Sequence, residues 1–346
     1  MNLLDTALTI ATTNPVNNGC APGMDVPVIL SLSSLLPGDL CALDENSEEV
    51  FYEFVQLSAI DHSAFSYNWP YVIQATRKQG FYYKNRQAII YFYFRKHTNN
   101  VQQYKLIVVN HLGHNSEELV HEIADAAKKL AIATIVKNID RDRILLWNDL
   151  GFTETVEPWS KYSFRDDNTF PEFVYDIKKF INLQVTRQTR SIINKFLREA
   201  QYTFLHYDQS FKESAVQLLE KTSEYLENKG VDFKEEVFLA HQFVFDDNIR
   251  NKTIFVVLEG TVLVGVTCLT QFKENLFVNA VFSESKSNLM RFFLWKSVVC
   301  YCESLEACQQ PIYLALQGSE NEGQNNWKRF FCPIRVIHRT HMTNSL

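Results

Sequence analysis

The sequence predicts an α/β protein (α+β in its sheet pattern) with two successive units, each a mixed, mainly antiparallel sheet flanked by helices. Three observations lead to this prediction. The chain has 346 residues, which is long for one domain and comfortable for two. Hydrophobic residues make up 46% of it, enough to bury a substantial core. Segments with strand-like and helix-like periodicity follow each other in the same order twice.

Residues 1–46 are expected to form an N-terminal arm, because they are rich in Asn, Thr, Ser, Pro and Gly. Within this arm only Val26–Leu30 looks like a strand, and Pro27 would confine that strand to a sheet edge.

The first unit is predicted over residues 47–168. Asn85, Arg86 and Gln87 separate two apolar runs and so predict a turn between paired strands. An amphipathic helix is expected over 117–130, with Ser116 at its N-cap and acidic residues in its first turn. In chain order we expect helices over 48–59 and 69–78, strands over 80–84, 88–95 and 104–110, the helix over 117–130, a strand over 132–137, a helix over 141–150 and a strand pair over 153–164.

Residues 169–200 are expected to be mostly helical and to link this unit to a second one over residues 201–346. The element order then recurs, although no sequence identity between the halves is visible. In chain order we expect a strand over 201–207, helices over 211–228 and 235–245, strands over 253–259, 262–271 and 275–282, a helix over 288–307, a strand over 312–316, a helix over 325–331 and a strand over 334–340.

Charge is distributed unevenly along the chain, whose net charge is −6. Nine of the 40 acidic residues precede Arg77, the first basic residue, so the chain from Arg77 onward carries a net charge of +3. A weakly positive body suits a phosphate-bearing donor, although ordinary solvated surface explains it too. This excess is too small for a dedicated nucleic-acid binder.

Seven cysteines without a regular spacing indicate free thiols in a reducing compartment. No basic segment precedes an apolar stretch at the N-terminus, and no run of about 18 apolar residues occurs, so we expect neither a secretory signal nor a transmembrane segment. These features predict a cytoplasmic protein.

Three short stretches carry a family resemblance, and they follow one another in a fixed order. They are Phe173–Ile177 with Phe180–Leu183, then Arg187–Phe196, then Leu316–Glu320 with Gly323 and Trp327–Phe331. Together with the element order, they resemble the tandem GNAT acyltransferases that include the C-terminal domain of phosphatidylglycerol lysyltransferases. More distantly the chain resembles the peptidoglycan aminoacyltransferases.

The resemblance implies a donor site where the central strand of a unit meets the next helix, because free amides at a helix N-terminus bind anions. Residues 110–117 and 282–290 are the two such junctions. Neither carries the usual GNAT signature Gln/Arg-x-x-Gly-x-Gly/Ala, which argues against acetyl-coenzyme A. At the second junction the predicted donor-binding residues are Ser283, Ser285, Lys286, Ser287, Asn288 and Arg291.

Acyl transfer to an amine needs a group that accepts a proton from the amine and groups that hold the two reactants. Glu320, which follows the expected strand 312–316, is the first candidate base, with a solvated turn acid as the alternative. Glu284, Asn279 and Tyr175 are further catalytic candidates, each of which could instead be structural. Predicted substrate-binding residues are Arg187, Arg190 and Lys328.

The loop of the first unit contains His111, Gly113, His114 and Asn115. Two histidines without a third ligand position do not predict a metal site.

We therefore expect an N-acyltransferase with no tightly bound cofactor, which moves an activated acyl group to an amine of a peptide or small molecule. A fatty acyl thioester of coenzyme A or acyl carrier protein is the favoured donor, because phenylalanine is abundant and the donor loops are poor in glycine. Aminoacyl-tRNA is the alternative donor. A catalytically inactive GNAT-like pair that serves as a binding module is a third reading.

Overall fold

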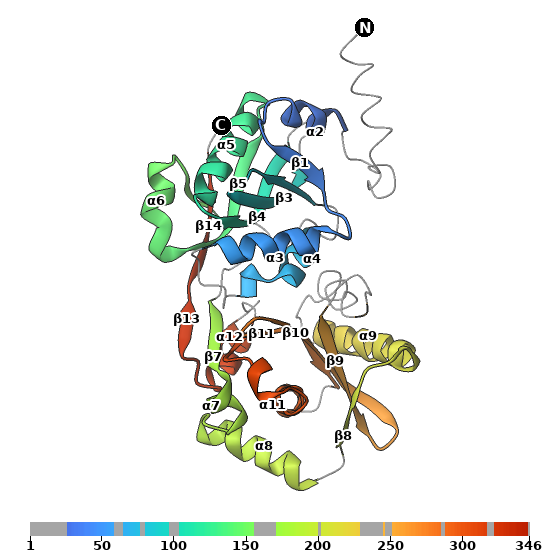
Figure 1. Cartoon of the computed structure of the whole chain (residues 1–346). Coiled ribbons are helices and arrows are strands. Elements are labelled where there is room, and N and C mark those ends of the chain that lie inside the picture. The colour runs from blue at the N-terminus through green and yellow to red at the C-terminus, as the bar shows by residue number, and fades with distance from the viewer. Residues whose placement is uncertain are drawn as a thin grey trace. The chain divides into compact units, whose positions relative to one another are not determined.

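The computed structural model describes residues 26–58, 65–76, 80–96, 104–155, 171–199, 202–228, 245, 251–284, 288–316 and 322–344. Two units emerge from the contacts within the chain. The N-terminal unit comprises Met1–Ile60, Val72–Asp167 and Arg339–Leu346, and the C-terminal unit comprises Asp61–Tyr71 and Asn168–His338 (Figure 1). Each unit contains one seven-stranded sheet.

The sheet of the N-terminal unit has the strand order β1-β2-β3-β4-β5-β14-β6. Its strands are β1 (Asp39–Ala42), β2 (Phe81–Lys84), β3 (Ala88–Lys96), β4 (Tyr104–Gly113), β5 (Ala133–Asp140), β6 (Thr153–Thr155) and β14 (Arg339–Thr343). All neighbours are antiparallel except β4 and β5, which are parallel.

Helices cover both faces of this sheet. On β3, Phe92 belongs to the same apolar core as Leu119 and Ile123 of α5 (Ser116–Lys129), whereas the neighbouring Tyr91 packs against Phe51 of α3 (Ser47–Leu57). Alternate side chains of a strand point to opposite faces, so α5 and α3 lie on opposite sides of the sheet. Shorter helical elements of this unit are α2 (Val26–Ser33), α6 (Ile144–Asp149) and the 3₁₀ turn η3 (Arg141–Arg143). The 3₁₀ turn η2 (Phe65–Tyr67) belongs to the C-terminal unit, and α4 (Trp69–Thr76) begins in that unit's range and ends in the N-terminal one.

The sheet of the C-terminal unit has the order β13-β7-β12-β11-β10-β9-β8. Its strands are β7 (Glu172–Asp176), β8 (Tyr202–His206), β9 (Lys252–Glu259), β10 (Val262–Phe272), β11 (Asn275–Ser283), β12 (Tyr313–Leu316) and β13 (Arg335–Ile337). The parallel pair is β11 and β12, which is the counterpart of β4 and β5 in the first sheet.

Two apolar cores lie on the two faces of this second sheet. One contains residues of α7 (Ile177–Ile181), α8 (Arg187–Glu199) and α11 (Leu289–Glu303), and the other contains residues of α9 (Lys212–Asn228). The remaining elements are the helix α12 (Glu322–Arg329) and the 3₁₀ turns η4 (Gln209–Phe211) and η6 (Ala307–Gln309). Among the described residues, no helix is both long and apolar enough to cross a membrane.

Two expected elements are corrected by the structure. Val26–Leu30, expected as a strand, begins the helix α2. Proline is tolerated in the first turn of a helix, and a short apolar run does not distinguish a helix from a strand. Glu172–Asp176, expected to be helical, forms β7, because it pairs with β12 on one side and β13 on the other. The helix expected over 235–245 lies outside the described residues except for Phe245.

The strand expected over 334–340 is in fact two strands that belong to different sheets. β13 pairs with β7 in the C-terminal unit, whereas β14 pairs with β5 and β6 in the N-terminal unit. Unlike the expected segments 169–200 and 201–346, the observed units therefore follow strand pairing: β7 completes the second sheet and the end of the chain completes the first.

Candidate functional site

The junction between β11 and α11 lies next to the parallel strand pair of the C-terminal unit. Among the described residues, β11 pairs with β12 from Asn275 to Val278, and β11 continues to Ser283. After the junction, Asn288 adopts a left-handed conformation with φ 67° and α11 begins at Leu289. The start of α11 thus follows the end of β11, and helix N-termini favour anions through their free amides and dipole.

Arg291, in the first turn of α11, is the feature of this junction that most needs an explanation. Its side chain is buried, with 7% exposed, and its Nε and Nη1 atoms have no hydrogen-bond partner among the residues that the structure describes. The guanidinium lies over the ring of Phe330, 4.8 Å from the ring centroid. Burial lowers the pKa of Arg291 from its usual value. A buried cation without a counter-charge is costly, so this position suits an anionic ligand.

The end of α12 holds Phe330 beneath Arg291. The hydroxyl of Tyr175 donates to the carbonyl oxygen of Lys328 at 3.0 Å, and the backbone amide of Thr186 donates to the carbonyl oxygen of Phe330 at 3.2 Å. Lys328 itself is buried, with 7% exposed. β7, α8 and α12 therefore fix the ring against which Arg291 packs.

Two predicted catalytic residues have structural surroundings. Tyr175 is 1% exposed, and burial raises the pKa of its hydroxyl well above the usual value, which makes it a poor proton donor. Asn279 accepts a hydrogen bond from Asn68 at 2.8 Å and donates one to Thr270 at 2.9 Å. Both residues join elements of the C-terminal unit, because the Tyr175 hydroxyl and the Asn279 amide group are engaged in these hydrogen bonds.

The other predicted site residues lie in three places. Ser283 and Glu284 end β11: the Ser283 hydroxyl donates to the Glu284 carbonyl oxygen at 3.2 Å, and the Glu284 amide donates to that of Val264 at 3.0 Å. Arg187 and Arg190 lie exposed on α8. Outside the described residues are Glu320, Ser285, Lys286 and Ser287.

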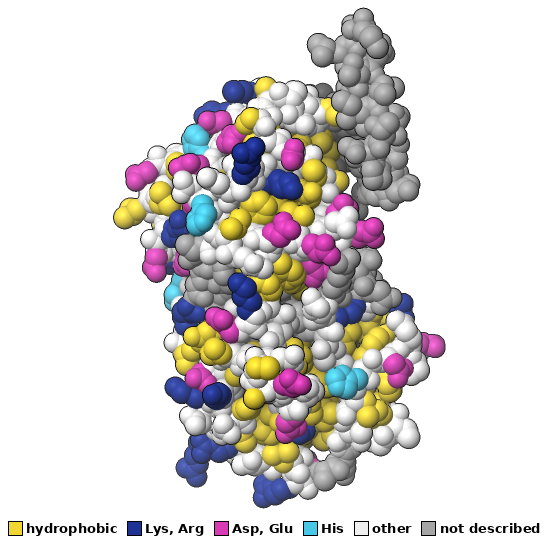
Figure 2. Space-filling model, in the orientation of Figure 1, with side chains coloured by type: hydrophobic (Ala, Val, Ile, Leu, Met, Phe, Trp, Pro, Cys, Tyr) yellow, Lys and Arg dark blue, Asp and Glu magenta, His cyan; other side chains and the backbone are white. Residues whose placement is uncertain are grey.

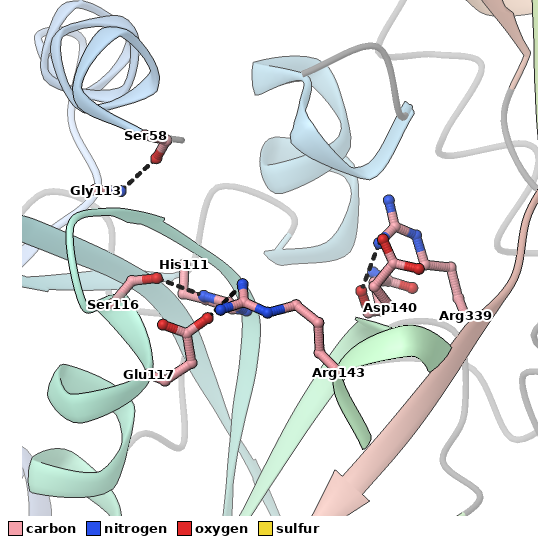
Figure 3. A network of polar contacts seen from close by, with 9 residues as sticks. Ser58, His111, Gly113, Ser116, Glu117, Asp140, Arg143 and Arg339 are labelled. Carbon is pink, nitrogen blue, oxygen red and sulfur yellow. Dashed lines mark hydrogen bonds and ion pairs between the residues drawn. The ribbon is translucent and has the colours of Figure 1, made fainter. Parts of the chain in front are cut away.

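The corresponding junction of the N-terminal unit contains a polar network (Figure 3). Glu117, in the first turn of α5, forms an ion pair with Arg143 at 2.5 Å, and the Glu117 side chain is only 10% exposed. Gly113 adopts φ 100°, and its amide donates to the hydroxyl of Ser58. A side chain on Gly113 would collide with the backbone of Gln87. The chain's own carboxylate thus occupies the N-terminal end of α5, where an anionic ligand would otherwise bind.

His111 belongs to this network and was placed in the loop by the sequence, whereas the structure puts it in β4. Its Nδ1 atom lies 2.8 Å from the hydroxyl of Ser116, and its ring meets Trp147 edge to face at 5.5 Å. Burial lowers the pKa of His111 to about 4, with the positive charges of Arg143 and Arg339 acting in the same direction and Glu117 opposing them. Ser116 was expected as the N-cap of α5, but its hydroxyl is used by His111 and the cap position is Asn115.

Sequence reasoning missed Glu117, Arg143 and Arg339 as members of one cluster. Arg339 lies 3.6 Å from Asp140 across the β5–β14 pair. Acidic residues after Ser116 were noted only as favourable charges for a helix start. Nothing in the sequence relates them to residues 26 and more positions away. Within the described residues, no group of three metal-ligating side chains occurs.

Comparisons with known structures support the fold. A conserved protein of unknown function from Bacteroides thetaiotaomicron VPI-5482 superimposes with a TM-score of 0.66 at 12% identity, over 90% of this chain and 100% of that chain. FemX superimposes with a TM-score of 0.59 at 10% identity, over 89% and 97% of the two chains. L-PGS from Bacillus licheniformis gives a TM-score of 0.55 at 17% identity, over 85% and 90%. The chain therefore shares its fold with these three proteins over most of its length.

No curated protein matches the sequence. Residues 59–279, more than half of the chain, match the family described as phosphatidylglycerol lysyltransferase, C-terminal. The matched residues include β2 to β6 of the first sheet and extend into β11, and they end before the junction that leads into α11. The chain therefore belongs to the family of the C-terminal domain of phosphatidylglycerol lysyltransferases.

Proposed function

We propose that this protein transfers an aminoacyl group from an aminoacyl-tRNA to an amine of a peptide or small molecule, and that the donor binds at the start of α11. The observation that carries the proposal is the buried guanidinium of Arg291, whose Nε and Nη1 atoms have no hydrogen-bond partner among the described residues. A phosphate of the donor would supply the missing negative charge, and a guanidinium recognises phosphate with two parallel hydrogen bonds. The family, which is named for lysyl transfer, supports an aminoacyl donor.

The reaction itself makes modest demands on the protein. The acceptor nitrogen attacks the ester carbonyl, the carbon–oxygen bond to the tRNA breaks, and the proton lost by the amine ends on the released hydroxyl. A carboxylate near the junction would assist by accepting that proton. Glu284, at the end of β11, and Glu320, which follows β12 in the sequence, remain our candidates for this role.

The two junctions support a division of labour between the units. At α5 the carboxylate of Glu117 is paired with Arg143, whereas at α11 no described residue bonds to Nε or Nη1 of the buried Arg291. Only the second arrangement gains from an added anion, because an anion at the first would meet a buried negative charge. We infer that the C-terminal unit binds the donor.

A fatty acyl thioester is the second candidate donor, and one observation favours it. The phosphates of coenzyme A would also provide the negative charge and hydrogen-bond acceptors for the buried guanidinium of Arg291. The aromatic residues argue against this donor. Their abundance in the sequence suggested an acyl channel, but the structure uses them for packing. Phe196, Phe292 and Phe293 are packed in the core of the C-terminal unit, with Phe196 and Phe292 stacked at 5.4 Å. The phenylalanine content is thus largely explained by packing.

Native mass spectrometry with a panel of donors tests the proposal. The purified chain would be offered lysyl-tRNA and other charged tRNAs, acyl-coenzyme A and acylated carrier protein, followed by transfer assays with amine acceptors. Transfer from a charged tRNA is the expected result. Transfer from acyl thioesters alone would overturn the tRNA donor in favour of the second candidate, and transfer from neither would favour a binding module.

Substitution of Arg291 tests the site separately. Arg291→Met should weaken donor binding by more than tenfold, since a charge-assisted contact to phosphate would be lost. The same change should leave thermal stability unchanged or raise it, because it removes an uncompensated buried charge. Arg86→Met, an exposed position of the N-terminal unit, is the matched control. Wild-type donor affinity in Arg291→Met would show that the donor binds elsewhere.

A further inference from the structure

One stretch of the C-terminal unit is strongly basic. Between Ile177 and Arg198 the sequence contains six basic residues and no acidic residue, in a chain whose net charge is −6. All six side chains are exposed, and Figure 2 shows lysines and arginines gathered over α7 and α8. We call this the α7–α8 basic face; its residues are Lys178, Lys179, Arg187, Arg190, Lys195 and Arg198.

A shallow, open groove lies along α8 within this face, and side chains of that one helix line it. Its lining is polar or cationic apart from one leucine. The lining residues recur at intervals of three and four, so they form one stripe of the helix, roughly 16 Å long at 1.5 Å per residue. They are Arg187, Arg190, Ser191, Asn194, Leu197 and Arg198.

Two arginines of the groove are held in position by the backbone. Arg190 donates from Nε to the carbonyl oxygen of Leu183 at 3.1 Å and from Nη2 to that of Val185 at 3.4 Å. Arg198 donates from Nε to the carbonyl oxygen of Asn194 at 3.2 Å. No ion pair neutralises Arg187, Arg190 or Arg198 within the described residues. A ligand would therefore meet partly immobilised guanidinium groups, which reduces the entropy cost of binding.

The composition of the stripe distinguishes between polyanions. Arginine, serine and asparagine side chains are those that contact the phosphates of nucleic acids. A membrane-binding helix would need an apolar face free to enter the lipid. The apolar face of α8 is not free, because Ile193 is fully buried and Phe196 stacks on Phe292 of α11. These features favour a nucleic acid over an anionic membrane.

The backbone links the start of the basic face to the donor site through Thr186. Thr186, directly before α8, binds the carbonyl oxygen of Phe330, and the ring of Phe330 supports Arg291. The next residue is Arg187, the first of the groove. A strand of RNA whose end reaches Arg291 could thus continue along α8.

We propose that the α7–α8 basic face binds the sugar-phosphate backbone of the RNA that carries the donor acyl group. This inference rests on the proposed function and adds the surface that recognises the carrier. It assigns Arg187 and Arg198 to the binding of RNA phosphates outside the reacting centre. Their loss should raise the KM for the charged tRNA and leave kcat at saturating donor unchanged.

The experiment measures the binding of a fluorescein-labelled, uncharged tRNA by anisotropy between 50 and 300 mM salt. Compared with the wild type, Arg187→Gln/Arg198→Gln should bind at least tenfold more weakly at the lowest salt. The slope of log K against log salt should decrease in magnitude by about 1.4 to 1.8, which corresponds to two lost phosphate contacts. Lys128→Gln/Lys129→Gln, two exposed lysines that end α5, is the matched control and should bind like the wild type. Thermal melting of each variant verifies that it is folded.

The outcomes separate this inference from the proposed function. If the wild type binds and uses tRNA but the double variant keeps its affinity and salt slope, the α8 surface is wrong and the tRNA donor stands. Failure of the wild type to bind tRNA would overturn both. Vesicles of phosphatidylcholine and phosphatidylglycerol, and an acidic acyl carrier protein, serve as competing ligands. If binding of either of these, and not of tRNA, depends on Arg187 and Arg198, the face recognises that partner and the inference falls.

Discussion

His111 stays uncharged in the folded protein because it is buried against Trp147 and close to two arginines. Protonating its ring would add a third positive charge beside the guanidinium groups of Arg143 and Arg339, against which the carboxylate of Glu117 acts. The pKa of about 4 lies below the usual value of 6.5, so the unfolded chain binds the proton more tightly than the folded one.

This difference predicts a loss of stability in mild acid. The free energy of unfolding should fall as the pH drops from about 6.5 to about 4, by about 3 kcal/mol for this group alone. Urea unfolding at several pH values measures the slope. His111→Asn, which keeps a polar partner for Ser116, should show a smaller slope over that interval. An equal slope in both proteins would mean that other groups cause the acid sensitivity.

Single residues also show where sequence reasoning stops. The position of Arg291 in the sequence predicts that it lies at the donor junction. The structure adds that its side chain is buried and that its Nε and Nη1 atoms have no hydrogen-bond partner among the described residues. Asn279 was left open between a reactive and a structural role, and its partners Asn68 and Thr270 come from distant parts of the chain. The burial of a side chain and its hydrogen-bond partners depend on tertiary packing, which cannot be read from the neighbouring residues in the sequence.

At the scale of elements, α11 lies so close to β10 that the strand needs a glycine. A Cβ atom on Gly265 would overlap the ring of Phe293, which is fully buried in the core between them. The helix α11 also carries Arg291, so this contact helps to fix the distance between that residue's helix and the sheet. Overpacking at such a point forces a shift of backbone or side chains.

Gly265→Ala should therefore destabilise the protein by about 1–3 kcal/mol. Chemical denaturation of Gly265→Ala, Phe293→Leu and the double variant forms a double-mutant cycle. The smaller leucine should relieve the collision, so the double variant should be more stable than the sum of the two single effects by about 1 kcal/mol. Additive effects would show that the ring is not what excludes the methyl group.

The sequence predicts elements well where their hydrophobic periodicity is long and clear. It does not predict short elements whose type depends on the strands or helices that they pack against. Helix α5 begins within one residue of its expected start, since its apolar stripe and its charges are local properties. The helix α2 and the strand β7 were assigned to the wrong type, because each is short and apolar throughout. For such segments the neighbouring elements decide between helix and strand.

At the scale of the whole molecule, one strand from the end of the sequence joins the sheet of the first half, and an inner strand of the second sheet begins the C-terminal half. β14 lies between β5 and β6 of the first sheet, and β7 lies between β12 and β13 of the second. Ile337 and Met342 are five residues apart and both buried, yet they belong to different units. Local sequence patterns predict that this segment forms a strand. They do not predict that it forms two strands, β13 and β14, in different sheets.

A matched pair of substitutions tests this division. Met342→Ala should accelerate hydrogen exchange chiefly in β4, β5 and β14, whereas Ile337→Ala should do so chiefly in β7, β12 and β13. Each removes a buried side chain and should cost about 1–4 kcal/mol in the unit concerned. Exchange measured by mass spectrometry resolves the two sets. If both substitutions accelerated the same peptides, the strands would not belong to separate units.

The position of β14 has a consequence for how the chain folds as it is made. An inner strand of the first sheet is supplied by residues 339–343, near the end of the sequence. While the ribosome is still translating the C-terminal unit, the gap between β5 and β6 stays open and their backbone groups lack partners. Domains commonly fold in the order in which they are synthesised. Here the half that is made first cannot complete its sheet until residues 339–343 have been made.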